Sequence, residues 1–244
     1  MKNTSLTIRA QARGGMFLGP DSFAGAVITI KDVKTNKVLA SGFTDDGDSG
    51  IHSPDFSYDA SPCPIITNSV PCISTYWVIA TGTTVKFTTE LVLKEPTLLE
   101  ISARIPLPPE QGDQFVRATQ WVLPKIGINT GPGYVLEVPG LWIQPEVVNN
   151  GNTIRVRAKV TMMCGCEINL NSPWLPNDFD ISGTITLNKK DANFKEGLEF
   201  VFQENSQYLA DIEVPQKGDY QIELNAFQKS TGNMGYAVTE VKYG

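Results

Sequence analysis

The chain has 244 residues, of which 41% are apolar and 19% are charged; its 20 Lys and Arg stand against 26 Asp and Glu, a formal net charge of −6. Such a composition supports a sizeable core and excludes an intrinsically disordered chain. The acidic balance excludes a nucleic-acid surface, which needs clustered Lys and Arg, and disfavours binding to an anionic membrane. The sequence contains no run of about 18 apolar residues and therefore predicts no membrane-spanning helix.

The N-terminal residues Met1 to Ala12 alternate between polar and apolar side chains and do not form the apolar stretch of a secretory signal. We therefore expect either a cytoplasmic protein or the mature form of an exported one.

Period-two alternation recurs along the chain, and no convincing window shows helical periodicity, so the sequence predicts an all-β protein. Short strands broken by Gly, Pro and Asn are typical of sandwiches or small barrels. The expected strands are Ser5 to Ala12, Ala24 to Val33, Lys37 to Phe43, Thr75 to Ala80, Thr84 to Leu93, Leu98 to Ile105, Arg117 to Leu123, Thr153 to Met163, Asp180 to Asn188, Leu198 to Gln203, Tyr208 to Val214, Asp219 to Phe227 and Met234 to Tyr243.

A domain boundary is expected near Gly131 to Gly140, where Gly-Pro-Gly and Pro139-Gly140 bracket the apolar segment Tyr134 to Val138. The split at about residue 140 gives domains 1–139 and 140–244, each of ordinary size. Clusters of Asn, Gly and Pro from Glu146 to Asn152 are read as a loop.

The stretch that opens Gly218-Asp219-Tyr220 and later turns through Gly232-Asn233 resembles the final hairpin of bacterial immunoglobulin-like domains. The first half is weakly similar to transthyretin-type sandwiches, through Ala24 to Val27 and Leu39 to Gly47. These resemblances imply two tandem antiparallel β-sandwich domains. They imply no activity, because transthyretin-like hydrolases carry functional histidines and a Tyr-Arg-Gly-Ser tail, whereas this chain has one His and ends Lys-Tyr-Gly.

The whole chain also resembles a group of bacterial two-domain β-sandwich proteins. The likeness rests on the Gly-Gly-x-Phe-x-Gly opening at Gly14 to Gly19, the segment Thr161-Met-Met-Cys-Gly-Cys166 and the following Pro173-Trp174. The resemblance supports the two-part architecture and implies no established activity.

The segment Thr161 to Cys166 allows three interpretations. On a straight strand Met162, Cys164 and Cys166 share one face, which suits a buried strand end. Thiolate and thioether ligands favour Cu(I), so Cys164 and Cys166 with Met162 or Met163 are a candidate copper site, although a lone Cys-x-Cys pair lacks further cysteine ligands. The third interpretation is a disulfide, between these two cysteines or with another cysteine.

Cys63 and Cys72 flank a short proline-bounded loop, and we expect a disulfide between them in an oxidising compartment. Asp45, Asp46 and Asp48 are oxygen donors that could suit calcium, but their spacing favours a simple Asp and Gly turn.

The motif Gly47-Asp48-Ser49-Gly50 is identical to the nucleophile segment of chymotrypsin-like proteases. Here it does not predict a hydrolase, because those enzymes order the triad His, Asp, Ser, whereas His52 follows Ser49.

Two tryptophans are assigned to the core, Trp77 and Trp121, because each lies within an alternating strand. Trp174, held between Pro173 and Pro176, is instead expected on an exposed loop, where it could anchor a protein partner.

Together these patterns favour a noncatalytic protein-binding or assembly module, a subunit of a larger complex that binds a protein partner or assembles with itself. No cofactor is expected. The alternative is a copper-handling protein that uses the Met-Cys segment.

Overall fold

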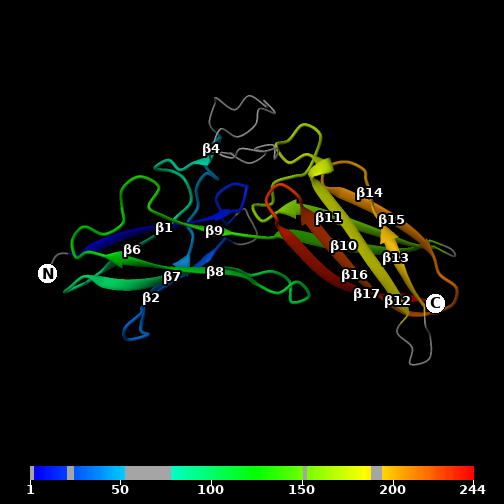
Figure 1. The fold of residues 1–244 in the computed structure, drawn as a ribbon, viewed down its shortest axis with the longest axis horizontal. Helices are drawn as coiled ribbons and strands as arrows, with labels where there is room; N and C mark the ends of the chain where they lie inside the picture. The colour runs from blue at the N-terminus through cyan, green and yellow to red at the C-terminus, as the bar shows by residue number, and fades with distance from the viewer. Residues whose placement is uncertain (1–2, 21–24, 53–77, 151–152, 188–193) are drawn as a thin grey trace, which may run out of the picture. The chain divides into compact units, whose positions relative to one another are not determined.

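The computed structural model describes residues 3–20, 25–52, 78–150, 153–187 and 194–244 (Figure 1). Within these ranges the protein is all β apart from one 3-10 turn at Pro176–Asp178, as expected, and no helix is long and apolar enough to cross a bilayer. The strands are β1 (Thr4–Ala12), β2 (Val27–Asp32), β3 (Val38–Phe43), β4 (Ile51–His52), β5 (Val78–Ile79), β6 (Phe87–Leu91), β7 (Thr97–Ile105), β8 (Gln114–Val122), β9 (Tyr134–Val138), β10 (Leu141–Asn150), β11 (Thr153–Met162), β12 (Phe179–Leu187), β13 (Lys195–Glu199), β14 (Val201–Phe202), β15 (Gln207–Glu213), β16 (Gly218–Gln228) and β17 (Met234–Tyr243).

The chain forms two compact units. The first comprises Met1–Leu107 and Asp113–Val138, and the second comprises Pro139–Gly244 together with Pro108–Gly112. The tip of the β7–β8 hairpin therefore belongs to the second unit. Within that unit the side-chain amide of Gln111 donates to the Ile143 carbonyl (2.6 Å) and accepts from the Ile143 N–H (3.1 Å).

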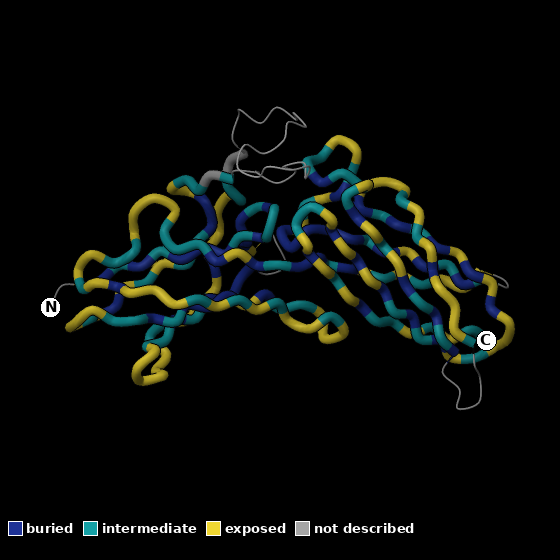
Figure 2. The backbone as a smooth tube through the Cα atoms, viewed as in Figure 1, coloured by how far each residue is buried: buried dark blue, intermediate teal, exposed yellow. Residues whose placement is uncertain are grey.

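The first unit contains a four-stranded antiparallel sheet of order β3-β2-β7-β8 and a three-stranded sheet of order β6-β1-β9, in which β1 and β9 are parallel. Burial in β1, β2 and β7 follows an alternating pattern, to which Arg9 and Ser102 add two buried residues on the opposite face; the buried stretches are dark blue in Figure 2. One face of each sheet therefore carries the core. The buried side chains include Leu6, Ile8, Ile28, Ile30, Leu99 and Ile101.

The second unit consists of two four-stranded sheets, β10-β11-β15-β14 and β13-β12-β16-β17. In chain order these strands correspond to A-B-E-D and C′-C-F-G, which is the strand order of an immunoglobulin-type sandwich. The second half is thus an immunoglobulin-like sandwich, as expected. Its core is built by alternate residues of β11 and β16, among them Ile154, Val156, Val160, Tyr220, Ile222 and Leu224.

Tyr220 supplies a second immunoglobulin feature. It lies near the start of β16, is fully buried, and donates a hydrogen bond from its hydroxyl to the Gln216 carbonyl (2.6 Å). This is the tyrosine corner of immunoglobulin sandwiches, which fixes the turn between strands E and F. The ring also packs edge-on against Phe194 at 5.9 Å. The Gly-Asp-Tyr opening noted in the sequence is therefore the start of strand F.

Three strands were not predicted: the two-residue β4, β9 and β10. β9 was read only as an apolar segment at the boundary, and β10 runs through Glu146 to Asn150, so the loop expected there is wrong over most of its length. β10 contains Pro145 and ends in Asn149 and Asn150, which resemble turn residues. Proline is tolerated because β10 is an edge strand that pairs only with β11.

We expect Tyr220→Phe to lower the free energy of unfolding by about 1 kcal/mol, because the buried ring stays while its hydrogen bond is lost. Urea unfolding measures the change. Tyr236→Phe, at an exposed position of β17, is the matched control and should leave stability unaltered. Equal stabilities of the Tyr220 variant and the wild type would show that the corner contributes nothing.

Candidate functional site

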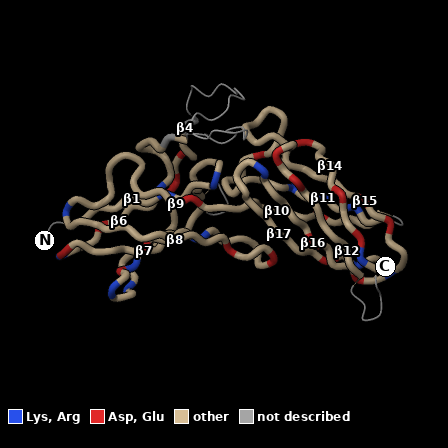
Figure 3. The backbone as a smooth tube through the Cα atoms, viewed as in Figure 1, with Lys and Arg blue, Asp and Glu red and all other residues tan. Residues whose placement is uncertain are grey.

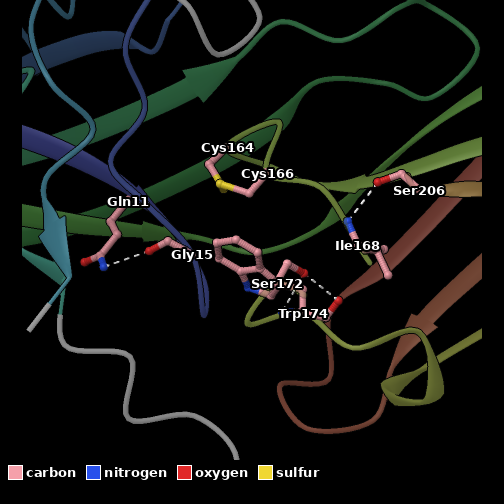
Figure 4. Close-up of a disulfide and its surroundings, with 8 residues drawn as sticks. All are labelled: Gln11, Gly15, Cys164, Cys166, Ile168, Ser172, Trp174 and Ser206. Atoms are coloured by element: carbon pink, nitrogen blue, oxygen red, sulfur yellow. Dashed lines mark hydrogen bonds between the residues drawn. A yellow bond between two sulfur atoms is a disulfide. The ribbon is translucent and has the colours of Figure 1, made fainter. Parts of the chain in front are cut away.

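The Met-Cys segment forms a disulfide-closed turn. β11 ends at Met162, the Gly165 N–H donates to the Met162 carbonyl (2.8 Å), and the Met162 N–H donates to the Cys166 carbonyl (3.3 Å). Gly165 has a φ of +76°, a conformation that glycine adopts without strain. Cys164 and Cys166 are joined by a disulfide, with Cα atoms 5.3 Å apart (Figure 4).

The strand expected over Thr153 to Met163 ends at Met162, and the straight continuation through Cys166 that the first interpretation assumed does not form, because the chain reverses at Gly165. Of the three interpretations, the structure has the disulfide within this pair. Both sulfur atoms bond to each other, so this oxidised state offers no thiolate to a metal ion. Met162 and Met163 are fully buried. The copper site stays a prediction for the reduced chain, and the described residues contain no group of three or more His, Cys, Asp or Glu that could hold a metal.

The segment after the turn is pinned to the neighbouring β14–β15 turn. The Ile168 N–H donates to the Ser206 hydroxyl (2.8 Å), and the Ser206 N–H donates to the Ile168 carbonyl (2.8 Å). Ser206 is fully buried, and its own carbonyl accepts from the Val160 N–H (2.9 Å). These bonds connect the B–C and D–E loops of the immunoglobulin sandwich.

Trp174 is buried rather than exposed, with 6% of its surface accessible. The Trp174 N–H donates to the Ser172 hydroxyl (3.1 Å; Figure 4). The Trp174 carbonyl accepts from the Asn169 N–H (3.2 Å), so the segment folds back on itself. The expectation of an exposed loop aromatic is wrong. A buried indole offers a partner little surface, so this residue does not define the binding site.

Asp178 holds the end of the same loop to the β16–β17 hairpin. Its carboxylate accepts hydrogen bonds from the Ser230 N–H (2.9 Å), the Ser230 hydroxyl (2.5 Å) and the Gln228 amide (3.0 Å). The B–C, D–E and F–G loops are thereby cross-linked. The polar groups of these loops are hydrogen-bonded to one another, so this end of the sandwich has a structural role.

In the first unit, Asp48 closes a turn against the segment 81–84. Its carboxylate accepts from the hydroxyls of Thr83 (2.6 Å) and Thr84 (2.7 Å) and from the Gly50 N–H (2.9 Å). These bonds, that from Thr83 first, hold the pKa of Asp48 below its usual range because they stabilise the charged form.

A buried cation lies near this turn. Arg9, on β1, is 3% exposed and donates to the carbonyls of Pro132 (2.5 Å) and Thr81 (3.1 Å). Burial lowers the pKa of Arg9, whereas the charges of Asp45 and Asp48 raise it. Asp45 also accepts the Lys86 N–H (2.7 Å). The carboxylates of Asp45 and Asp48 therefore stabilise a turn and compensate the charge of the Arg9 guanidinium. A calcium ion would have to displace the hydrogen-bond donors that these carboxylates already have.

Among the described residues, the most exposed aromatic side chains are Phe43, Phe115 and Trp121, and all three lie on the four-stranded sheet of the first unit. Trp121 is 61% exposed on β8, so its expected core position is wrong. The register pairs it with Leu98, on the face opposite the core residue Leu99. We call this the outer sheet face. Its apolar members are Val27, Val33, Phe43, Leu98, Phe115 and Trp121, and its charged members are Lys31, Glu100, Arg104 and Arg117.

Ion pairs lie among the aromatic residues of the outer sheet face. Arg104 pairs with Asp113 at 2.6 Å, and Glu100 lies between Lys31 (3.9 Å) and Arg117 (3.7 Å). β7 and β8 are mostly uncharged, as the tan tube of Figure 3 shows. The face thus combines exposed aromatic surface with internally compensated charge.

Four further sequence candidates are not tested. Cys63, Cys72 and Trp77 lie outside the described residues, as does the side chain of His52. The predicted Cys63–Cys72 disulfide therefore stays a prediction. Ser49 is described, and its carbonyl accepts the Phe17 N–H (3.1 Å).

Three solved structures share a likeness with the chain. A protein from Bacteroides uniformis ATCC 8492, described as a "putative carbohydrate binding protein", has 15% identity and a TM-score of 0.29 and covers 99% of this chain and 100% of its own. The chicken interferon gamma receptor alpha chain has 10% identity and a TM-score of 0.37, covering 99% and 98%. A variant of titin domains I67–I69 has 13% identity and a TM-score of 0.23, covering 99% and 64%. At these values the likenesses indicate nothing about a ligand. No protein-family model and no curated protein matches the chain.

We expect Cys164 and Cys166 to resist alkylation in the native, unreduced protein, because their sulfur atoms are bonded to each other. After reduction both should be alkylated, and peptide mass spectrometry reads the difference. Reduction should cost roughly 1–2 kcal/mol of stability, since the closed loop is very short. Two reactive thiols without reductant would contradict the disulfide.

We expect Asp48→Asn to lower the melting temperature at neutral pH and to lose that effect in acid. The pKa of Asp48 is depressed in the folded state, so its stabilisation is present above the unfolded pKa of about 3.9 and is lost as pH falls through the folded value. Melting curves from pH 7 to pH 2 measure the difference from wild type. Asp46→Asn, exposed in the same loop, is the control. A difference that persists unchanged in acid would refute this role.

Proposed function

We propose that the chain is a noncatalytic protein-binding or assembly module that engages its partner through the outer sheet face of the first unit. The observation that carries this proposal is the exposure of three aromatic residues on one sheet face. Phe43 is 59% exposed, Phe115 53% and Trp121 61%. Aromatic side chains are enriched at protein interfaces, and these three are exposed at the two ends of one sheet face.

The composition of the outer sheet face supports a protein partner. Trp, Phe and Arg are the residue types enriched at protein interfaces, and Trp and Arg carry most binding hot spots. Arg104 and Arg117 lie on the same face as the aromatic residues and are held by Asp113 and Glu100. These ion pairs hold the two arginine side chains on the face, where a protein partner can contact them.

The remainder of the described surface supports the same choice. Acidic and basic residues are interspersed along both units, which offers nucleic acid no continuous basic track (Figure 3). The loops at one end of the immunoglobulin-like unit are engaged with one another through Ser206 and Asp178. The outer sheet face is therefore the better candidate for binding.

We expect Trp121→Arg to weaken partner binding by about 30-fold, since loss of a hot-spot aromatic costs at least 2 kcal/mol. The immobilised full chain is used for capture from its native source, with bound proteins quantified by mass spectrometry. Val201→Arg, which changes an exposed residue of β14 in the other unit, is the matched control and should retain capture. Equal capture by both variants and wild type would reject the outer sheet face as the binding site.

A further inference from the structure

We propose that the partner on the outer sheet face is a second copy of this chain, related by a two-fold axis that lies between the two faces and runs across the strands. This inference rests on the proposed function and names the partner for the same surface. Two observations carry it: the arrangement of apolar residues at the two ends of the face and the arrangement of charges between them.

Strand register divides the face into rows that run across the sheet. The first row is apolar apart from Arg104, and the last is fully apolar. The two middle rows are polar or charged, apart from Val38. In order, the rows are Phe43, Val27, Arg104 and Phe115; then Ser41, Thr29, Ser102 and Arg117; then Val38, Lys31, Glu100 and Thr119; then Val33, Leu98 and Trp121.

A two-fold axis across the strands exchanges the first row with the last and the two middle rows with each other. Trp121 of each copy then lies opposite Phe115 of the other, because both are on β8. The aromatic and aliphatic residues of the two ends then meet at both edges of the contact, and Arg104, which is paired with Asp113, lies opposite Leu98 of the other copy. A contact of this kind uses the same patch on both copies and closes as a dimer, the commonest form of symmetric assembly.

The charges are complementary under the same operation. Arg117 lies on β8 in the second row, and Glu100 lies on β7 in the third. After the two-fold rotation, Arg117 of one copy and Glu100 of the other lie in the same row. They are on neighbouring strands, Arg117 on β8 and Glu100 on β7. Lys31 lies on the far side of Glu100, so each carboxylate is flanked by cations and no like charges face each other directly.

The test is the oligomeric state of the purified full chain, measured by sedimentation equilibrium. Protein concentrations from about 1 μM to about 1 mM detect dimers with dissociation constants in that range. Wild type and Val201→Arg should dimerise. Trp121→Arg should weaken dimerisation at least tenfold. Circular dichroism confirms that each variant is folded.

Charge exchange tests the arrangement itself. Arg117→Glu alone and Glu100→Arg alone should each be at least tenfold weaker as dimers, because each places like charges in neighbouring positions across the contact. An equimolar mixture of the two variants should recover a heterodimer, since each copy then supplies the sign that the other lacks. Dimers in the wild type with no recovery in the mixture would overturn the arrangement across the strands.

Two results separate this inference from the proposed function. A wild-type chain that is monomeric throughout the range, while capture of another protein still depends on Trp121, overturns the second copy as partner and leaves the binding face intact. A monomeric chain whose capture is indifferent to Trp121→Arg overturns both.

Discussion

A β-sheet has two faces, and a two-sheet sandwich buries only one of each. In the first unit the inner faces are filled by Ile and Leu from β1, β2 and β7, which satisfies the hydrophobic drive to pack. Among the residues that the structure describes, no layer of the first unit covers the outer face of β3-β2-β7-β8. Phe115 and Trp121 are therefore left in solvent by the geometry of the sheet.

The same constraint has a different outcome in the immunoglobulin-like unit. In that unit the loops at one end are the elements that could bind a partner. Their polar groups, however, are hydrogen-bonded to one another and stabilise the sandwich. The disulfide closes the turn after β11, Ser206 joins it to the β14–β15 turn, and Asp178 joins it to the β16–β17 hairpin. Buried polar groups need hydrogen-bond partners, and in this unit the partners of each loop come from the neighbouring loops. For this reason the proposed binding site lies on the sheet face of the first unit and not on these loops.

The architecture was readable from the sequence because its signals are local. Alternation places Ile28 and Ile30 on one face whatever the fold, and Gly218-Asp219-Tyr220 marks the start of strand F because the tyrosine corner requires it. β10 escaped prediction for an equally local reason. Pro145 and the Asn pair at its end resemble turn residues, and only its position at a sheet edge makes them acceptable in a strand.

The binding candidates were not readable in the same way. Residues 115–122 alternate, but the aromatic residues lie on one face and Val116, Ala118 and Val122 on the other, so the sequence alone favours neither face as the inner one. Trp174 presents the opposite case, a proline-flanked loop residue that the fold buries. The sequence by itself determined the strand content and the immunoglobulin character of the second half, and it identified the Met-Cys segment as chemically distinctive. Only the tertiary structure decided which aromatic residues face solvent and that Cys164 and Cys166 bond to each other, because both depend on which distant strands pair and on where the chain turns.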